Sequence, residues 1–159
     1  MSITGIANAR QERNKNSLTF RAAAVEGKNL VGIWKSQGLR IEAPKIEGAA
    51  SLKQGVGLEL SDATMSGGVK LVAERPSSVV GSKEKQTATI TAPTATFEMP
   101  TNKITAKGNV TITNSDPAAS QKLTAKGSSG VITLEDQTTK RKAIRTAVLE
   151  GPVSLDLHG

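Results

Sequence analysis

The sequence predicts an all-β protein, and three observations lead to this prediction. Thr, Val, Ile and Gly dominate the chain from about residue 18 onward. Polar and apolar residues alternate, most clearly over residues 104–113, where every even position is apolar or Gly and every odd position is polar. A short phrase built around Gly recurs along the chain. Alternation with period two is typical of a strand with one buried face, because a helix would scatter the same residues around its circumference.

Residues 1–17 are expected to differ from the rest of the chain. Residues 7–16 are rich in Arg, Gln, Glu and Lys, so this N-terminal segment is expected to be a short helix or disordered. Residues 18–157 are expected to form a single β domain. Within it the alternation returns at residues 65–71 and 149–157, whereas residues 72–85 lack it and are expected to form a loop or an irregular strand crossing.

The recurring phrase reads apolar, any, Gly, any, Val, any, Leu or Ile. It is complete at residues 65–71, 106–112 and 149–155, and weaker copies open at residues 25, 46 and 125. A second phrase, Ile-x-Ala-Pro, occupies residues 41–44 and 90–93. The Gly phrases recur about every 20 residues, with one copy missing, and this spacing suits a stack of similar strand pairs. Each Gly either marks a bulge or bend in a curved sheet or keeps the inner surface open.

The residue inventory excludes several classes of function. The chain of 159 residues has no Cys, and its one His, His158, is next to last. Disulfide scaffolds, thiolate zinc sites, cysteine nucleophiles and Ser-His-Asp relays are therefore not expected. Three aromatic residues in the whole chain argue against recognition of single-stranded nucleic acid by base stacking. We expect no catalysis, no metal and no cofactor.

The charge is positive, with 21 Lys and Arg against 14 Asp and Glu and a formal net charge of +7. The densest basic cluster is Lys140, Arg141, Lys142 and Arg145. A positive field attracts nucleic acid, anionic membranes and phosphorylated ligands alike, and a basic pI also serves solubility. No run of apolar residues reaches the length of a membrane helix. The first residues do not have the pattern of a secretory signal, so we expect a signal to have been removed from an extracytoplasmic chain.

Residues 90–112 resemble a repeat unit of the LptA/OstA-like family, the periplasmic components of lipopolysaccharide transport, which includes LptC and the N-terminal domain of LptD. The family unit has a small residue and an aromatic in one strand, then a turn, then an apolar strand with Gly-x-Val. The matching residues here are Ala92, Ala95, Phe97, Ile104, Gly108, Val110 and Ile112. Looser copies run over residues 39–71 and 123–155, so the resemblance covers roughly residues 18–157.

The resemblance implies a fold and a function. The fold is an antiparallel β-jellyroll shaped like a taco, with two splayed sheets built from strand-pair repeats of about 20 residues. The function is a non-catalytic, lipid-binding bridge module in the periplasm that holds the acyl chains of lipopolysaccharide in an apolar groove. Its partners would be the lipid and similar jellyrolls, which join end to end, and exposed strand edges would also suit a homo-oligomer.

The inward positions of the alternation are the candidate groove. Each of them also suits a closed core, but so many Ala and Gly among them favour a partly unfilled interior. The candidate lipid-groove residues are Ile41, Ile46, Leu58, Met65, Val69, Leu71, Ile90, Phe97, Ile104, Val110, Ile112, Leu149, Val153 and Leu155. The candidate phosphate contacts at the rim are Lys140, Arg141, Lys142 and Arg145, which equally suit a solvated loop that blunts a strand edge.

Two other hypotheses stay open on the sequence. A bactofilin-like filament would stack similar Gly-x-Val repeats around a closed core and bind no lipid, and its strands would be parallel. A hydrolase or sugar-binding jellyroll is disfavoured by the residue inventory.

Overall fold

A computed structural model describes residues 2–34, 39–53, 57–98, 101, 103–134 and 144–158. These residues form strands and one short 3-10 turn, Pro117–Ala119. The strands are β1 (Ser2–Thr4), β2 (Ile6–Arg13), β3 (Ser17–Ala24), β4 (Leu30–Trp34), β5 (Leu39–Ala43), β6 (Lys45–Lys53), β7 (Gly57–Pro76), β8 (Lys85–Glu98), β9 (Lys103–Asp116), β10 (Gln121–Leu134), β11 (Ile144–Glu150) and β12 (Ser154–His158). The expected all-β class is confirmed.

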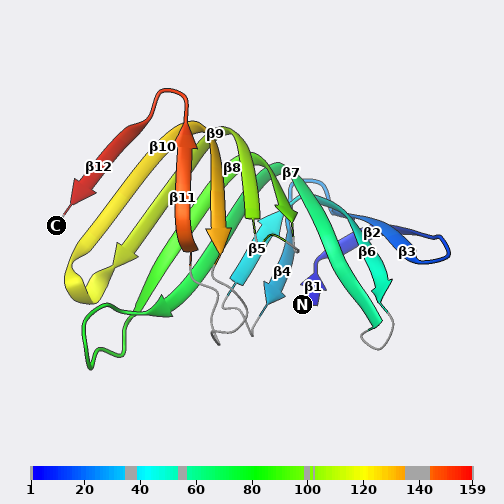
Figure 1. The fold of residues 1–159 in the computed structure, drawn as a ribbon, viewed down its shortest axis with the longest axis horizontal. Coiled ribbons are helices and arrows are strands. Elements are labelled where there is room, and N and C mark those ends of the chain that lie inside the picture. The colour runs from blue at the N-terminus through cyan, green and yellow to red at the C-terminus, as the bar shows by residue number, and fades with distance from the viewer. Residues whose placement is uncertain are drawn as a thin grey trace.

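The strands make one continuous sheet that is folded over on itself. The long strands β7 to β10 run through both halves of the fold, so the two expected sheets are two arms of a single sheet (Figure 1). Arm A contains, in order, β1, β4, β5, the adjacent halves of β7, β8, β9 and β10, and β12. Arm B contains β2, β3, β6, the other halves of β7 to β10, and β11.

Every strand pairing among the described residues is antiparallel. The parallel β-helix of the filament hypothesis is therefore wrong as a description of this chain. The physical reason lies in the connections, because short turns such as residues 14–16 between β2 and β3 can join only antiparallel neighbours.

The fold line between the arms is made of Gly and Pro, and we call it the crease. It passes through Gly5, Gly27, Pro44, Gly67 and Gly68, Pro93, Gly108, Gly127, Gly151 and Pro152. The strand register shifts where β7, β8 and β10 cross it, which marks β-bulges. Both recurring phrases of the sequence thus place their Gly or Pro at the crease, with Gly48 as the exception.

Close packing along the crease explains why Gly faces Pro there. A Cβ atom on Gly67 would lie 3.1 Å from Cγ of Pro44, and one on Gly108 would lie 3.2 Å from Cγ of Pro93. Both glycines also have positive φ, +86° and +76°, where a side chain is strained. The bend of the sheet therefore depends on a Gly, which has no side chain, on one strand and a Pro, which has a rigid ring, beside it on the neighbouring strand.

The expectation of a helix near the N-terminus is wrong. Residues 6–13 form β2, which pairs with β3 over its length, and all eight of its residues are exposed. Its charged composition is locally compatible with a helix, but the open edge of β3 offers backbone partners that a helix would leave unpaired.

The proposed boundary of a single domain at residue 18 stays a prediction. The irregular segment expected at 72–85 is shorter than predicted, since β7 runs to Pro76 and β8 begins at Lys85.

Candidate functional site

Apolar side chains line the inner surface of both arms in continuous cross-strand rows. In arm A, Ile41 pairs with Leu71, Leu71 with Ile90, and Ile90 with Ile112. In arm B, a matching row runs from Ile46 through Met65 to small residues on β8 and β9. Because antiparallel neighbours in register keep their side chains on the same face, the period-two pattern of each strand becomes one apolar surface.

The structure describes thirteen of the fourteen candidate groove side chains. Eight are buried: Ile46, Met65, Val69, Leu71, Ile90, Phe97, Ile104 and Val110. Ile41, Ile112 and Leu149 are half-buried and pack against this core. Val153 and Leu155 are exposed. Leu58 belongs to β7, but its side chain lies outside the described residues.

The middle of the fold is filled by the chain's own side chains. Met65, Ile104, Val110 and Ile132 are each at most 1% exposed. A cavity on the inner side, lined by Ile3, Leu30 and Ile41 among others, has a volume of about 20 Å³. That space suits about one water molecule and is far too small for an acyl chain. Where the structure describes their side chains, the central strands therefore form a packed, closed core.

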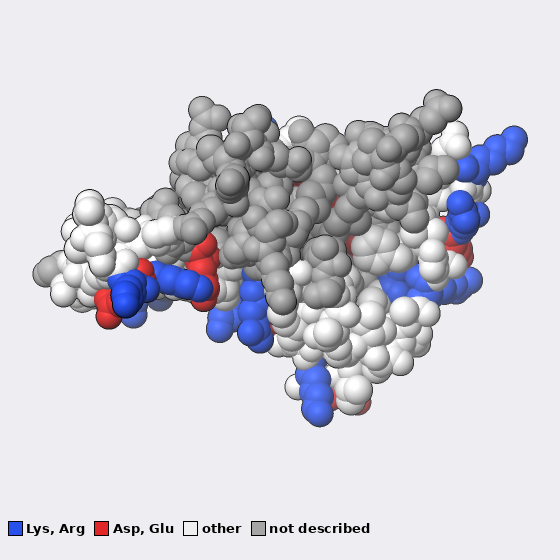
Figure 2. All heavy atoms as spheres, turned by 90° about the horizontal axis from the view of Figure 1, so that it is seen from below, with Lys and Arg blue, Asp and Glu red and all other residues white. Residues whose placement is uncertain are grey.

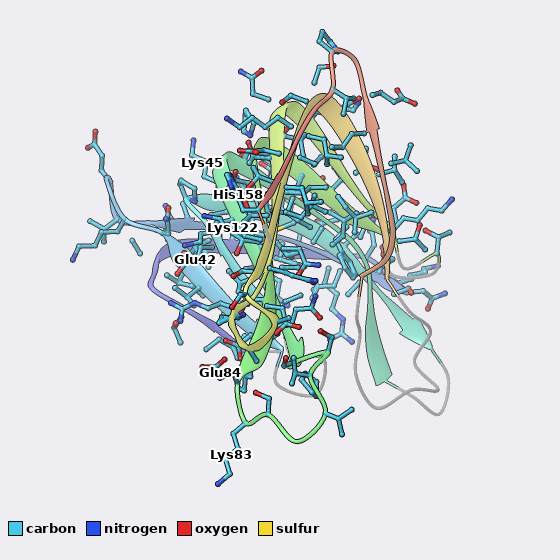
Figure 3. All side chains as sticks on the ribbon, turned by 90° about the vertical axis from the view of Figure 1, so that its left-hand side faces the viewer. Glu42, Lys45, Lys83, Glu84, Lys122 and His158 are labelled. Atoms are coloured by element: carbon cyan, nitrogen blue, oxygen red, sulfur yellow. The ribbon has the colours of Figure 1, made fainter. Side chains whose placement is uncertain are left out.

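The C-terminal end of the arch differs from the middle. The inner rows continue from Ala125 to Leu155 and from Leu123 to Leu157 on β12. There Val153, Leu155 and Leu157 are 52%, 68% and 71% exposed, and we call these three residues the apolar edge. Figure 3 looks into this end, where β11 and β12 are joined by a turn at the top and separate below it. The apolar edge is thus a part of the described inner surface that faces solvent.

Most of the predicted phosphate contacts cannot be placed. Lys140, Arg141 and Lys142 lie outside the described residues, and Arg145 belongs to β11 with its side chain undescribed. Figure 2 shows the described Lys and Arg side chains spread around the margin of one face rather than gathered in one cluster. On this face the described charges therefore form several small groups.

One buried carboxylate was missed by the sequence analysis. Asp116, 2% exposed, ends β9 and holds the loop over residues 77–84. Its Oδ1 accepts a hydrogen bond from the Ser77 hydroxyl at 2.6 Å, and its Oδ2 accepts one from the Ser78 amide at 2.9 Å and one from the Ser78 hydroxyl at 2.5 Å. These bonds, first the one from the Ser77 hydroxyl, lower the pKa of Asp116 to about 2. The available sequence signal was an Asp directly before Pro117, at the end of a predicted strand.

Metal-binding clusters are not found among the described residues. No group of three or more His, Asp or Glu side chains there is placed to hold a metal ion. Within the same residues, no helix has the length and apolar character needed to span a membrane.

Comparison with known proteins supports the fold. No family model matches the chain, and no curated protein sequence matches it. One similar solved structure is LptH, the LptA-homologous periplasmic component of the lipopolysaccharide transport device of Pseudomonas aeruginosa. The superposition has a TM-score of 0.59, covers 99% of this chain and 92% of LptH, and has 9% sequence identity. The protein therefore has an LptA-like antiparallel β-jellyroll fold, as the sequence resemblance implied.

Proposed function

We propose that this protein is a non-catalytic, lipid-binding bridge module of lipopolysaccharide transport that works in the periplasm. The observation that carries the proposal is the continuous apolar inner surface of a folded sheet, which ends uncovered at the apolar edge. The LptA-like fold supports it, since LptH belongs to a lipopolysaccharide transport device. Such a role makes and breaks no bond, so it requires no catalytic group.

The apolar edge is the proposed first contact for an acyl chain. Leu155 and Leu157 are already desolvated in part by their neighbours on β10, and each methylene that a lipid buries against them contributes about 0.8 kcal/mol. The buried candidates, such as Phe97 and Val110, would meet lipid only when the two arms separate around the crease. The predicted phosphate contacts near residues 140–145 remain part of the proposal as rim groups.

End-to-end joining is proposed at the strand edges. β1 and β2 are the last strands of the two arms at one end, and β12 and β11 at the other. Edge strands have unpaired backbone groups that a similar jellyroll can pair with. A neighbour on β12 would also cover the apolar edge.

Site-specific photocrosslinking tests the lipid proposal. A photoreactive residue is placed at Leu155, at Phe97 and at Val110, and at the outward neighbours Asp156 and Thr111 as matched controls. After irradiation with lipopolysaccharide, we expect labelled lipid on the inward positions, strongest at Leu155, and none on the outward ones. Adducts at Asp156 or Thr111 without adducts at any inward position would remove the proposal.

A further inference from the structure

A concavity with charged residues in its lining lies mainly on the outer face of arm B, with Phe20, Gly48 and Ala49 also in the lining, and we call it the outer cradle. It has a volume of about 460 Å³ and lies between the β2–β3 hairpin and strands β6 and β7. In Figure 1 this hairpin projects away from the body of the arch, at the right. The volume falls in the range of small-ligand sites. The outer cradle lies at the opposite end of the sheet from the apolar edge, so it is separate from the proposed lipid contact there.

The strands that form the outer cradle are held by a contact on their inner face. A Cβ atom on Gly48 would lie 2.6 Å from Cζ of Phe20 and 2.7 Å from the backbone oxygen of Asp62. Gly48 therefore allows the Phe20 ring of β3 to lie directly over β6, which ties the hairpin to the body. Next to it, the register of β6 and β7 shifts, and the Ser61 hydroxyl donates to the Ala49 carbonyl at 2.9 Å. A bulge of this kind bends the strand and increases its twist.

Charges of both signs are present in the lining. Arg10 faces Arg21 across β2 and β3, and Arg21 faces Glu47 across β3 and β6. The guanidinium of Arg10 is 3.3 Å from a carboxylate oxygen of Glu12, and that of Arg21 is 3.7 Å from one of Glu47. These are exposed, single contacts of little strength, so the groups can exchange them for a ligand. Asp62 adds an exposed carboxylate to the same lining.

This mixture of groups restricts the chemistry of a ligand. Three carboxylates repel a phosphate, two guanidiniums repel a metal cation, and an apolar ligand would desolvate all five charges. A neutral polyhydroxylated ligand meets none of these penalties, because each hydroxyl both donates and accepts. Carboxylates accept from such hydroxyls while guanidiniums donate to them.

We propose that the outer cradle binds a neutral saccharide chain. Glu47 and Asp62 accept hydrogen bonds from its hydroxyl groups, and Arg10 and Arg21 donate to its oxygen atoms. Phe20 is the aromatic residue in the described lining, and its ring packs over Gly48, so affinity is expected to come mainly from hydrogen bonding. Binding is therefore expected in the millimolar range.

Titration of the isotope-labelled protein with two neutral hexasaccharides, maltohexaose and hexa-N-acetylchitohexaose, tests this proposal by amide chemical shifts. We expect at least one of them to shift amides of β2, β3 and β6 around the outer cradle. Arg21→Gln and Asp62→Asn should each raise Kd roughly tenfold, because each removes a hydrogen bond to a charged group. Arg40→Gln is the matched control, since Arg40 forms the same kind of pair with Glu42 on β5, outside the outer cradle.

The titration has results that support the proposal and results that overturn it. Shifts at the outer cradle that weaken with Arg21→Gln or Asp62→Asn and not with Arg40→Gln support the proposal, provided the variants keep the amide pattern of the folded sheet. The proposal is overturned if neither hexasaccharide shifts these amides, if Arg40→Gln weakens binding equally, or if inorganic phosphate shifts them and the saccharides do not. Lipid crosslinking at Leu155 is unaffected by any of these results.

Discussion

The central strands and the C-terminal edge have the same inner pattern but differ in how much of it is covered. Leu71 and Leu155 stand in one cross-strand row of arm A, yet Leu71 is 2% exposed and Leu155 is 68% exposed. Leu71 has neighbouring strands on both sides, whereas Leu155 lies on the last strand of its arm. The difference teaches that inward direction alone does not bury a side chain. Burial also requires neighbours on both sides and the opposite arm above.

The largest expected effect comes from a substitution in the closed centre. Ile104→Ala should lower the free energy of unfolding by about 3 kcal/mol, because it leaves a cavity among fully buried neighbours. Leu155→Ala at the apolar edge should lower it by less than about 0.5 kcal/mol. Urea denaturation of both variants measures the contrast. Equal losses would show that the edge is as well covered as the centre.

A smaller effect is expected at the crease. Gly67→Ala should cost about 1–2 kcal/mol for its positive φ, with an added cost from the Pro44 ring. Gly68 also has positive φ, but a Cβ there would meet nothing within 4 Å. In a Pro44→Ala background, the cost of Gly67→Ala should therefore fall while that of Gly68→Ala stays the same. Urea denaturation of this double-mutant cycle checks the coupling, and a cost of Gly67→Ala that is unchanged in that background would refute the role of the ring.

The Asp116 anchor is expected to give a pH-dependent effect. Its pKa is about 2 in the folded protein and 3.8 ordinarily, so its ionised form stabilises the fold at pH values above 3.8. This contribution should be lost as the pH falls from about 4 through about 2. Asp116→Asn should thus lower Tm by a few degrees at pH 7 and converge with the parent near pH 2. Thermal denaturation across this range measures it, and a difference that persists undiminished at pH 2 would contradict the assignment.

The smallest effect on stability is expected for Leu155→Ser combined with Leu157→Ser. Because both side chains are already exposed, Tm should stay within a degree or so of the parent value. Self-association at high concentration should weaken, since the proposed neighbour would lose the apolar edge as a contact. Sedimentation velocity measures this, with Val148→Ser as the control because Val148 is an exposed apolar residue of β11 that pairs with Val131 outside the apolar edge. Equal weakening by the control would refute a specific role for the apolar edge.

Much of the fold could be predicted from local patterns. The alternation at residues 104–113 identified β9 and its buried face, with Ile104, Ala106 and Val110 now 0–1% exposed. The expected helix near the N-terminus failed because β2 is held by pairing with β3, a long-range partner that local composition does not reveal. Asp116 was missed for a similar reason, since the two serines that bind it lie 38 and 39 residues away in the chain.

By itself, the sequence determined which side chains point inward in the strands with a clear period-two pattern, and it marked the Gly and Pro positions where the sheet could bend, because strand period and the demands of Gly and Pro are local properties. It did not determine which parts of the inner rows are covered, nor that the two sheets are one. Those depend on how far each arm extends and which strand comes last, and so on contacts between residues distant in the chain. The closed centre, the apolar edge and the outer cradle were therefore decided by the tertiary structure alone.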